Sequence, residues 1–175
     1  MGLSRVIVIA LIVLQPSLLS AQDPAAQDRP ALVPDVIRNV VLDPTTYAPA
    51  LVAWTATRLD WQSSQIFFQN GLLEQNPGFT VSGRSNDTAI GYAAGNRQIF
   101  QDAFVNLQLS ALNNVSTRVV ERLLLPRYPR HRKLLRAIGW IERTVMASYW
   151  SYRLSAGHFR QWQENQQRAR QLGYD

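Results

Sequence analysis

The sequence contains no cysteine among its 175 residues, and this absence removes several classes of function. Without thiols there is no disulfide framework, no cysteine nucleophile and no cysteine-ligated metal. Only two histidines occur, His131 and His158, and no carboxylate residue stands at helical ligand spacing from either, so no zinc site with three or four ligands can be assembled. No Gly-x-Ser-x-Gly elbow, phosphate loop or dinucleotide fingerprint is present. We therefore predict no cofactor and no metal, and we favour a non-enzymatic role.

Long apolar runs are also missing, apart from a short one at the N-terminus. Arg5 supplies a positive charge, residues 6–14 are apolar without interruption, and Ala21 ends a following stretch of small and apolar residues. This is the tripartite form of a secretory signal peptide, and the run is shorter than the roughly 20 apolar residues that a membrane span needs. We expect residues 1–21 to be a cleaved signal peptide, residues 22–30 a disordered leader, and the mature protein to be periplasmic or secreted. The alternative is an uncleaved segment that tethers the chain to a membrane.

Lysine is nearly absent, since Lys133 is the only one, and this preference for arginine is typical of a bacterial genome rich in G and C. The charge is also unevenly placed. Residues 22–117 carry five arginines against eight acids, whereas residues 118–175 carry twelve basic residues against four acids. We expect acids of the first half to pair with arginines of the second half, and we do not expect nucleic acid as a partner of an exported protein.

The strongest helical pattern covers residues 49–70. Pro49 suits the first turn of a helix, the next twenty-one residues contain no glycine or proline, and Gly71 suits the position just after a helix. Ala53, Ala56 and Ser63 share one face with Asp60 and Phe67. This stripe of mostly small residues predicts that a partner helix approaches closely.

Asp60 is the unusual residue of this stripe, because a buried carboxylate needs partners. We expect it to accept hydrogen bonds in a structural role, with Arg97 and Arg143 as the first candidate partners. Two alternatives remain open: Asp60 is a ligand-binding or catalytic carboxylate acting with Glu74, or it is exposed on the surface.

The residues Asp60-x-x-Ser63-Ser64 and Gly71-x-x-Glu74-x-Asn76-Pro77 resemble the first-helix pattern of an uncharacterised bacterial family of small multi-helix membrane proteins of unknown function. The resemblance covers residues 60–77 and implies a helical hairpin geometry around Asp60 and Glu74. It implies no activity. The later helices of this chain depart from the family because they are too polar to span a bilayer.

Three further helices are predicted around this one. Residues 31–42 form a short amphipathic helix, with a strand as the alternative because β-branched residues dominate. A second helix begins near Thr88, and its Gly91 and Gly95 are expected to lie against the small face of the central helix. Residues 113–114 either break this helix or lie inside it.

The last helical region begins near Arg130. Its apolar residues recur at helical spacing and are expected to pack against neighbouring helices: they are Leu134, Ile138, Ile141, Val145, Tyr149 and Tyr152. Residues 155–158 are a possible kink, and a polar tail ends at Gly173. The predicted fold is an all-α, single-domain bundle of about four to five helices over residues 31–175.

A strongly basic turn joins the last two helical regions between Pro126 and Pro129. It and the helix after it concentrate the positive residues Arg127, Arg130, Arg132, Lys133 and Arg136. Such a cluster suits the anionic head groups of a membrane surface, and the alternative is a solvated connector with weak ion pairs.

Three functions remain as hypotheses. The first is a non-enzymatic exported domain that packs against a periplasmic or membrane protein or a membrane surface. The second is a small-ligand or lipid-binding bundle, with a pocket lined by Trp54, Trp61, Phe67 and Trp140 and with Asp60 as its polar anchor; the candidate ligand-binding residues are Asp60, Ser64, Glu74, Arg97 and Arg143. The third is a hydrolase that uses Asp60 and Glu74. The oligomeric state is left open.

Overall fold

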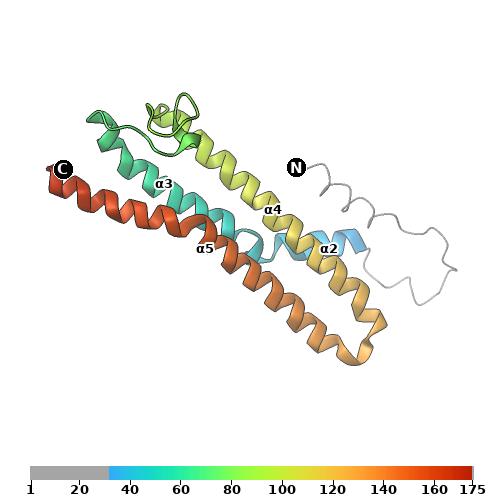
Figure 1. Ribbon diagram of the computed structural model, residues 1–175. Helices are drawn as coiled ribbons and strands as arrows, with labels where there is room; N and C mark the ends of the chain where they lie inside the picture. The colour runs from blue at the N-terminus through green and yellow to red at the C-terminus, as the bar shows by residue number, and fades with distance from the viewer. Residues whose placement is uncertain (1–31, 175) are drawn as a thin grey trace. The chain divides into compact units, whose positions relative to one another are not determined.

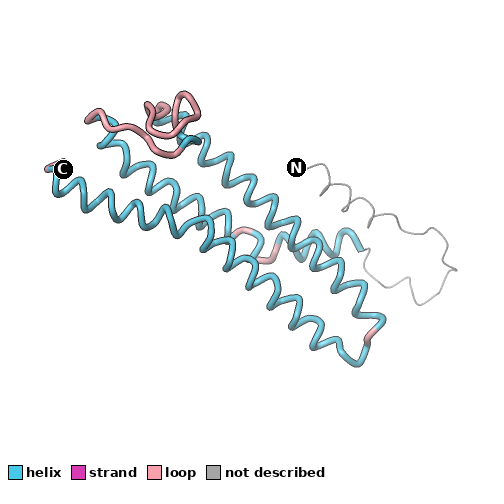
Figure 2. Tube along the Cα trace, viewed as in Figure 1, coloured by secondary structure: helices cyan, strands magenta, loops and turns pink. Residues whose placement is uncertain are grey.

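A computed structural model describes residues 32–174, so the predicted signal peptide and leader lie outside the described residues. The all-α prediction is confirmed (Figures 1 and 2): the described chain contains the α-helices α2 (Leu32–Val41), α3 (Ala48–Gln69), α4 (Tyr92–Arg127) and α5 (Arg132–Leu172). Short 3-10 turns lie at η2 (Pro44–Thr46), η3 (Pro77–Phe79) and η4 (Pro129–His131). Between residues 32 and 174 the β-pairing is limited to two isolated bridges, Glu74 with Asp87 and Thr80 with Ala89.

α4 and α5 form a long antiparallel hairpin, and the two shorter helices pack along it (Figure 1). α3 runs in the direction of α5 and contacts both hairpin helices, and α2 packs on α4. Asp43, just before α3, contacts Arg143 of α5, so the part of α5 that precedes Arg143 extends beyond the start of α3. Within residues 32–174 no helix combines the length and the hydropathy needed to cross a bilayer.

The ends of α3 follow from local sequence signals, as predicted. Pro49 lies in the first turn of the helix, and Gly71 follows it with a positive φ of 81°. The amide of Gly71 donates to Phe68 O at 3.1 Å and the amide of Leu72 donates to Phe67 O at 3.0 Å. This is the Schellman arrangement, which satisfies the last carbonyls of the helix and turns the chain away from it.

The segment between α3 and α4 returns over the end of α3 and contributes to the core. Phe79 is buried there and stacks obliquely on Trp61, with 5.1 Å between the ring centroids, and Ile99 of α4 completes the cluster. Gly95 lies directly against the Trp61 ring, which occupies the space that a Cβ would need. The predicted close approach at Gly95 is therefore present, but against Trp61 and not against the small face of α3. Gly91 precedes the helix.

The small face of α3 lies against α5 instead of α4. Ala53 and Ala56 are buried, and the polar residues of the same stripe contact α5 directly. Residues 113–114 lie inside α4, and residues 155–158 lie inside the continuous helix α5.

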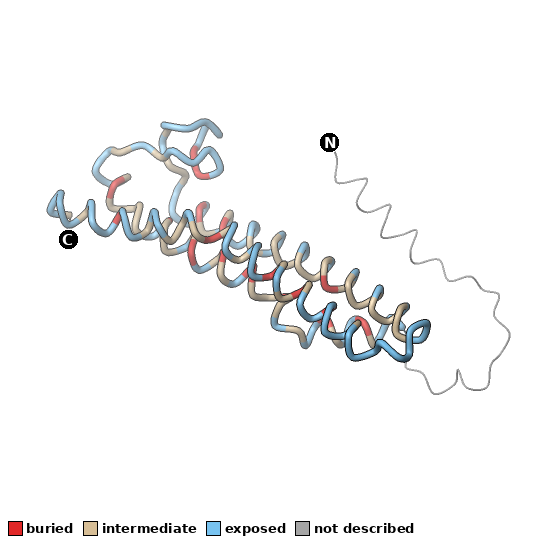
Figure 3. The backbone as a smooth tube through the Cα atoms, turned by 60° about the horizontal axis from the view of Figure 1, so that its bottom comes forward, coloured by how far each residue is buried: buried red, intermediate tan, exposed pale blue. Residues whose placement is uncertain are grey.

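The expected packing of the apolar stripe on α5 is wrong. Leu134, Ile138, Ile141, Val145, Tyr149 and Tyr152 are all more than half exposed. Gly139, Arg143 and Ala147 are the buried residues of this half of the helix, so the opposite face points inward (Figure 3).

Candidate functional site

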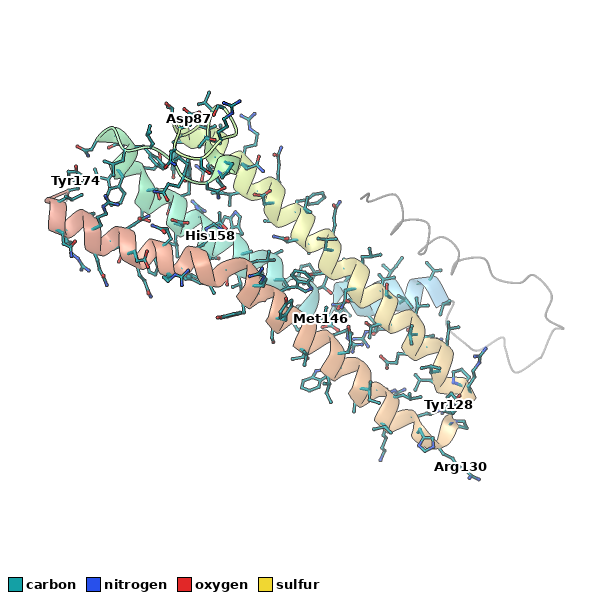
Figure 4. All side chains as sticks on the ribbon, in the orientation of Figure 1. Asp87, Tyr128, Arg130, Met146, His158 and Tyr174 are labelled. Carbon is teal, nitrogen blue, oxygen red and sulfur yellow. The ribbon has the colours of Figure 1, made fainter. Side chains whose placement is uncertain are left out.

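Asp60 is held by a histidine of α5. Its Oδ2 lies 2.8 Å from His158 Nδ1, and its side chain is 17% exposed. A carboxylate accepts hydrogen bonds, so this contact places a proton on Nδ1 and leaves Nε2 as the second, acceptor nitrogen of the neutral ring. Figure 4 shows His158 on α5 beside α3. Nε2 makes no hydrogen bond to any residue from 32 to 174.

Asn165, two turns further along α5, completes the cluster. Its buried side-chain amide donates to Ser64 Oγ at 2.9 Å and to Ser63 Oγ at 3.0 Å, and it reaches Asp60 Oδ1 at 3.4 Å. The side chain of Gln161 donates to Asn165 Oδ1 at 3.0 Å. The polar groups of the α3 stripe are therefore satisfied by α5, which explains how Asp60 and the serines tolerate a helix interface.

A cavity of about 680 Å³ opens beside this cluster, between α3, α5 and the segment that follows α3. Trp61, Phe67 and Phe79 give it buried aromatic walls. Asp60, Ser64, His158 and Asn165 supply polar groups on one side. The rim includes the exposed residues Arg153, Gly157 and Arg168. Twelve of the twenty lining residues are polar, so the cavity combines aromatic walls with an extensive polar lining.

The charged groups around the cavity are balanced in number. Asp60 and Glu74 are the acidic residues of its lining, and Arg153 and Arg168 are the arginines. The Arg168 guanidinium lies 5.8 Å from the centroid of the Phe67 ring, a cation–π distance. The lining therefore favours neither sign of charge strongly, and His158 Nε2 and the Ser64 hydroxyl remain to bond a polar group of a guest molecule.

Three of the five predicted ligand-binding residues meet at this cavity. Asp60, Ser64 and Glu74 all line it. Arg143 does not: it is buried further along α5 and binds Asp43 at 3.0 Å and Glu121 at 3.3 Å. Arg97 is exposed on α4. The prediction that Arg97 or Arg143 pairs with Asp60 is therefore wrong.

The predicted aromatic lining is confirmed for two of its four residues. Trp61 and Phe67 line the cavity, whereas Trp54 lies outside its lining and stacks with Arg58. Trp140 is 61% exposed near the other end of the hairpin. Sequence reasoning gave no role to His158, in the predicted kink, or to Asn165, in the polar tail, because neither stretch has a pattern that indicates its partner helix.

The predicted pairing of early acids with late arginines occurs around Asp43, away from the cavity. Arg118 and Arg143 bind its Oδ2 at 2.8 and 3.0 Å, and its Oδ1 accepts from the amide and hydroxyl of Thr45. Burial on its own raises the pKa of Asp43, but the hydrogen bonds from Thr45 and Arg118 and the charge of Arg143 outweigh it, so the pKa is lowered. Nearby, buried Asn114 donates to the hydroxyls of Thr45 and Thr46. These contacts join α4, α5 and the η2 turn.

A second cavity, of about 460 Å³, lies between α4 and α5. Leu109, Leu112, Met146 and Trp150 give it a mainly apolar lining. It contains no acidic or basic residue, so it offers fewer means of orienting a guest molecule. Within residues 32–174 no group of three or more carboxylate and histidine residues is placed to hold a metal ion.

The chain matches no known protein family, no curated protein and no solved structure. The resemblance of residues 60–77 to a family of small membrane proteins therefore stays a prediction.

Proposed function

We propose that this protein is an exported, non-catalytic binding protein that holds a small organic molecule in the cavity between α3 and α5. The observation that carries this proposal is the meeting of buried aromatic walls and the Asp60–His158–Asn165 cluster at one cavity of about 680 Å³. Sites for drug-sized molecules have volumes of about 300–1,000 Å³. The aromatic walls suit an aromatic or other flat apolar guest, and the polar side suits one hydrogen-bonding group.

The role of the polar cluster in this proposal is to orient the guest. Asp60 holds the His158 ring through Nδ1, and the ring is thereby set with Nε2 as a hydrogen-bond acceptor. Asn165 fixes Ser64 in the same way. Because these side chains are already held by each other, little ordering entropy is lost when a guest binds.

Gly157 offers a direct test of the cavity. It lies at the rim, in the middle of α5, and a Cβ added there meets no atom within 4 Å. A Cβ at position 157 therefore fits without displacing a neighbour. Gly157→Phe is designed to cover the cavity with its ring, and Gly157→Ala is the matched control that leaves the cavity open. The probe is N-phenyl-1-naphthylamine, which is uncharged and aromatic, carries one N–H donor and fluoresces in apolar surroundings.

We expect saturable binding of this probe to the wild-type protein and to Gly157→Ala, and binding at least about tenfold weaker to Gly157→Phe, which corresponds to about 1.4 kcal/mol. His158→Phe removes the acceptor nitrogen and should weaken binding by several-fold. Equal binding to the wild-type protein and Gly157→Phe, or no saturable binding to any of them, would contradict the proposal.

Hydrolysis is the second candidate, because Asp60 and Glu74 line the same cavity. Its weakness is that both carboxylates already accept hydrogen bonds, Asp60 from α5 and Glu74 from the amide of Asn76 at 2.7 Å. Turnover of chromogenic esters, phosphates or glycosides that disappears in both Asp60→Asn and Glu74→Gln would replace simple binding by hydrolysis.

The exported location is proposed from residues 1–21 and is tested separately. Cell fractionation with intact-mass measurement should find a soluble periplasmic or secreted species that begins at Gln22. A membrane-bound species that retains Met1 would show that the N-terminal segment is an anchor.

A further inference from the structure

The end of the α4–α5 hairpin carries many more basic residues than acidic ones, and its one acid, Glu121, binds Arg143. We define the hairpin end as residues 120–141, which include η4 and the adjoining turns of both helices. Between residues 122 and 141 the sequence has six basic residues and no acid. Arg122 binds Asp35 of α2. The other five are exposed and form no ion pair with any residue that the structure describes: Arg127, Arg130, Arg132, Lys133 and Arg136.

The same hairpin end exposes large apolar and aromatic side chains. Seven are at least half exposed: Val120, Leu123, Tyr128, Leu134, Ile138, Trp140 and Ile141. Figure 3 shows this end as largely exposed, and Figure 4 shows Tyr128 and Arg130 pointing outward from the turn. Isolated exposed apolar residues are ordinary on a protein surface, but a group of this size usually marks an interaction site.

The exposure follows from the lengths of the helices. α5 has 41 residues and α3 has 22, and the start of α3 lies near the level of Arg143. The first turns of α5 therefore have no third helix to cover them, and α2 packs on α4. The seven apolar side chains of the hairpin end therefore remain at least half exposed.

We propose that the hairpin end docks on the surface of an anionic phospholipid bilayer. Arginine and lysine would bind the phosphate groups, and Trp140, Tyr128 and the aliphatic side chains would enter the head-group layer, where amphipathic side chains of this kind are stabilised. The positive charge of the hairpin end favours an anionic bilayer over a second copy of the chain as its partner. A two-fold dimer through the same surface brings the two basic clusters together, and like charges at an interface oppose association.

The electrostatic part is tested with two variants of equal charge change in the full chain. In the first, Arg127, Arg130, Arg132 and Lys133 are replaced by glutamine. In the second, the control, the exposed residues Arg84, Arg97, Arg160 and Arg170 are replaced by glutamine. Both retain residues 1–31, so any contribution of that segment to membrane binding is shared. Binding is measured by co-sedimentation with phosphatidylcholine vesicles that contain or lack phosphatidylglycerol.

We expect the wild-type protein to bind the vesicles with phosphatidylglycerol, and to bind them less in high salt. Each basic residue close to an anionic surface contributes roughly a factor of five to binding, so the hairpin-end variant should bind at least about tenfold more weakly. The control variant should keep nearly all of the binding. Equal loss in both variants would reduce the effect to net charge and would overturn the proposal, as would equal binding by all three proteins.

The apolar part has its own readout. Replacing Leu134 and Ile138 by serine and Trp140 by alanine leaves the charge unchanged, and we expect vesicle binding to weaken several-fold while the circular dichroism spectrum stays the same. If the wild-type protein is instead a lipid-free dimer in sedimentation, and this variant is a monomer, a second copy of the chain covers the surface and the membrane proposal is wrong.

Discussion

The interior of this protein contains charged residues whose burial and binding partners differ. Asp60 and Arg143 both carry charge between helices, yet their surroundings differ. The side chain of Asp60 is 17% exposed and bonds a half-buried histidine, whereas the side chain of Arg143 is 3% exposed and binds two carboxylates. The loss of stability on replacing each residue depends on which buried groups are left without a hydrogen bond or a counter-ion.

Asp60→Ala is expected to lower the free energy of unfolding by about 1–2 kcal/mol, because His158 and Asn165 lose hydrogen bonds but His158 keeps access to water. Arg143→Ala should cost more, about 3–5 kcal/mol, because it leaves Asp43 and Glu121 without their buried cation. Urea denaturation of both variants gives the comparison. If Asp60→Ala is the more destabilising, Asp60 and not Arg143 is the main buried charge.

The lowered pKa of Asp43 predicts a dependence of stability on pH. A carboxyl whose pKa is lower in the folded chain stabilises the fold fully above its unfolded value, 3.8, and this contribution is lost as the pH falls through the folded pKa. The wild-type protein should therefore be more stable than Asp43→Asn at pH 7, and the difference should shrink below about pH 4. A difference that stays constant down to pH 2 would show that the Asp43 charge does not contribute.

Gly95 tests the packing of α4 on α3 at a single atom. A Cβ at this position would lie 2.3 Å from the Trp61 ring, so Gly95→Ala should lower the free energy of unfolding by about 1–3 kcal/mol. Gly157→Ala is the control, since it meets no atom and should stabilise α5 by up to about 1 kcal/mol. Two stabilising substitutions would mean that Trp61 does not pack where the structure places it.

At the scale of whole elements, the ends of helices could be predicted and their inward faces could not. Pro49, Gly71 and Gly173 mark helix ends through local backbone chemistry that needs no knowledge of the partner. Gly71 and Gly173 both adopt the positive φ that the sequence suggested. The stripe on α5 from Leu134 to Tyr152 has a clear helical period, but it is exposed because the opposite face of α5, with Gly139, Arg143 and Ala147, is the one that points inward.

The orientation of α5 is open to a direct stability measurement. Ile138→Gln and Ile141→Gln should each change the free energy of unfolding by no more than about 0.5 kcal/mol, since both side chains are more than half exposed. Ala56→Leu, at a position with no exposed surface, should cost about 1–3 kcal/mol. Losses above about 2 kcal/mol at Ile138 or Ile141 would show that this face is buried.

At the scale of the whole protein, the candidate site depends on the register of α3 against α5. Asp60 and His158 are 98 positions apart, and Asn165 and Ser64 are 101 apart. No local pattern reports such a register, so the sequence singled out Asp60, Ser64 and Glu74 on one helix and its turn but paired Asp60 with the wrong side chains. The excess of positive charge after residue 118 was predictable, and its division between the Asp43 network and the hairpin end was not.

The two histidines separate the two proposed sites, because His158 lies at the cavity and His131 at the hairpin end. The most direct test of the cavity is therefore a side-chain ¹H–¹⁵N NMR titration of the histidines with N-phenyl-1-naphthylamine. We predict that the resonances of the His158 ring shift with saturation while those of His131 do not move. A titration in which the probe binds but His158 stays unchanged, or in which His131 alone responds, would contradict the assignment of the cavity as the binding site.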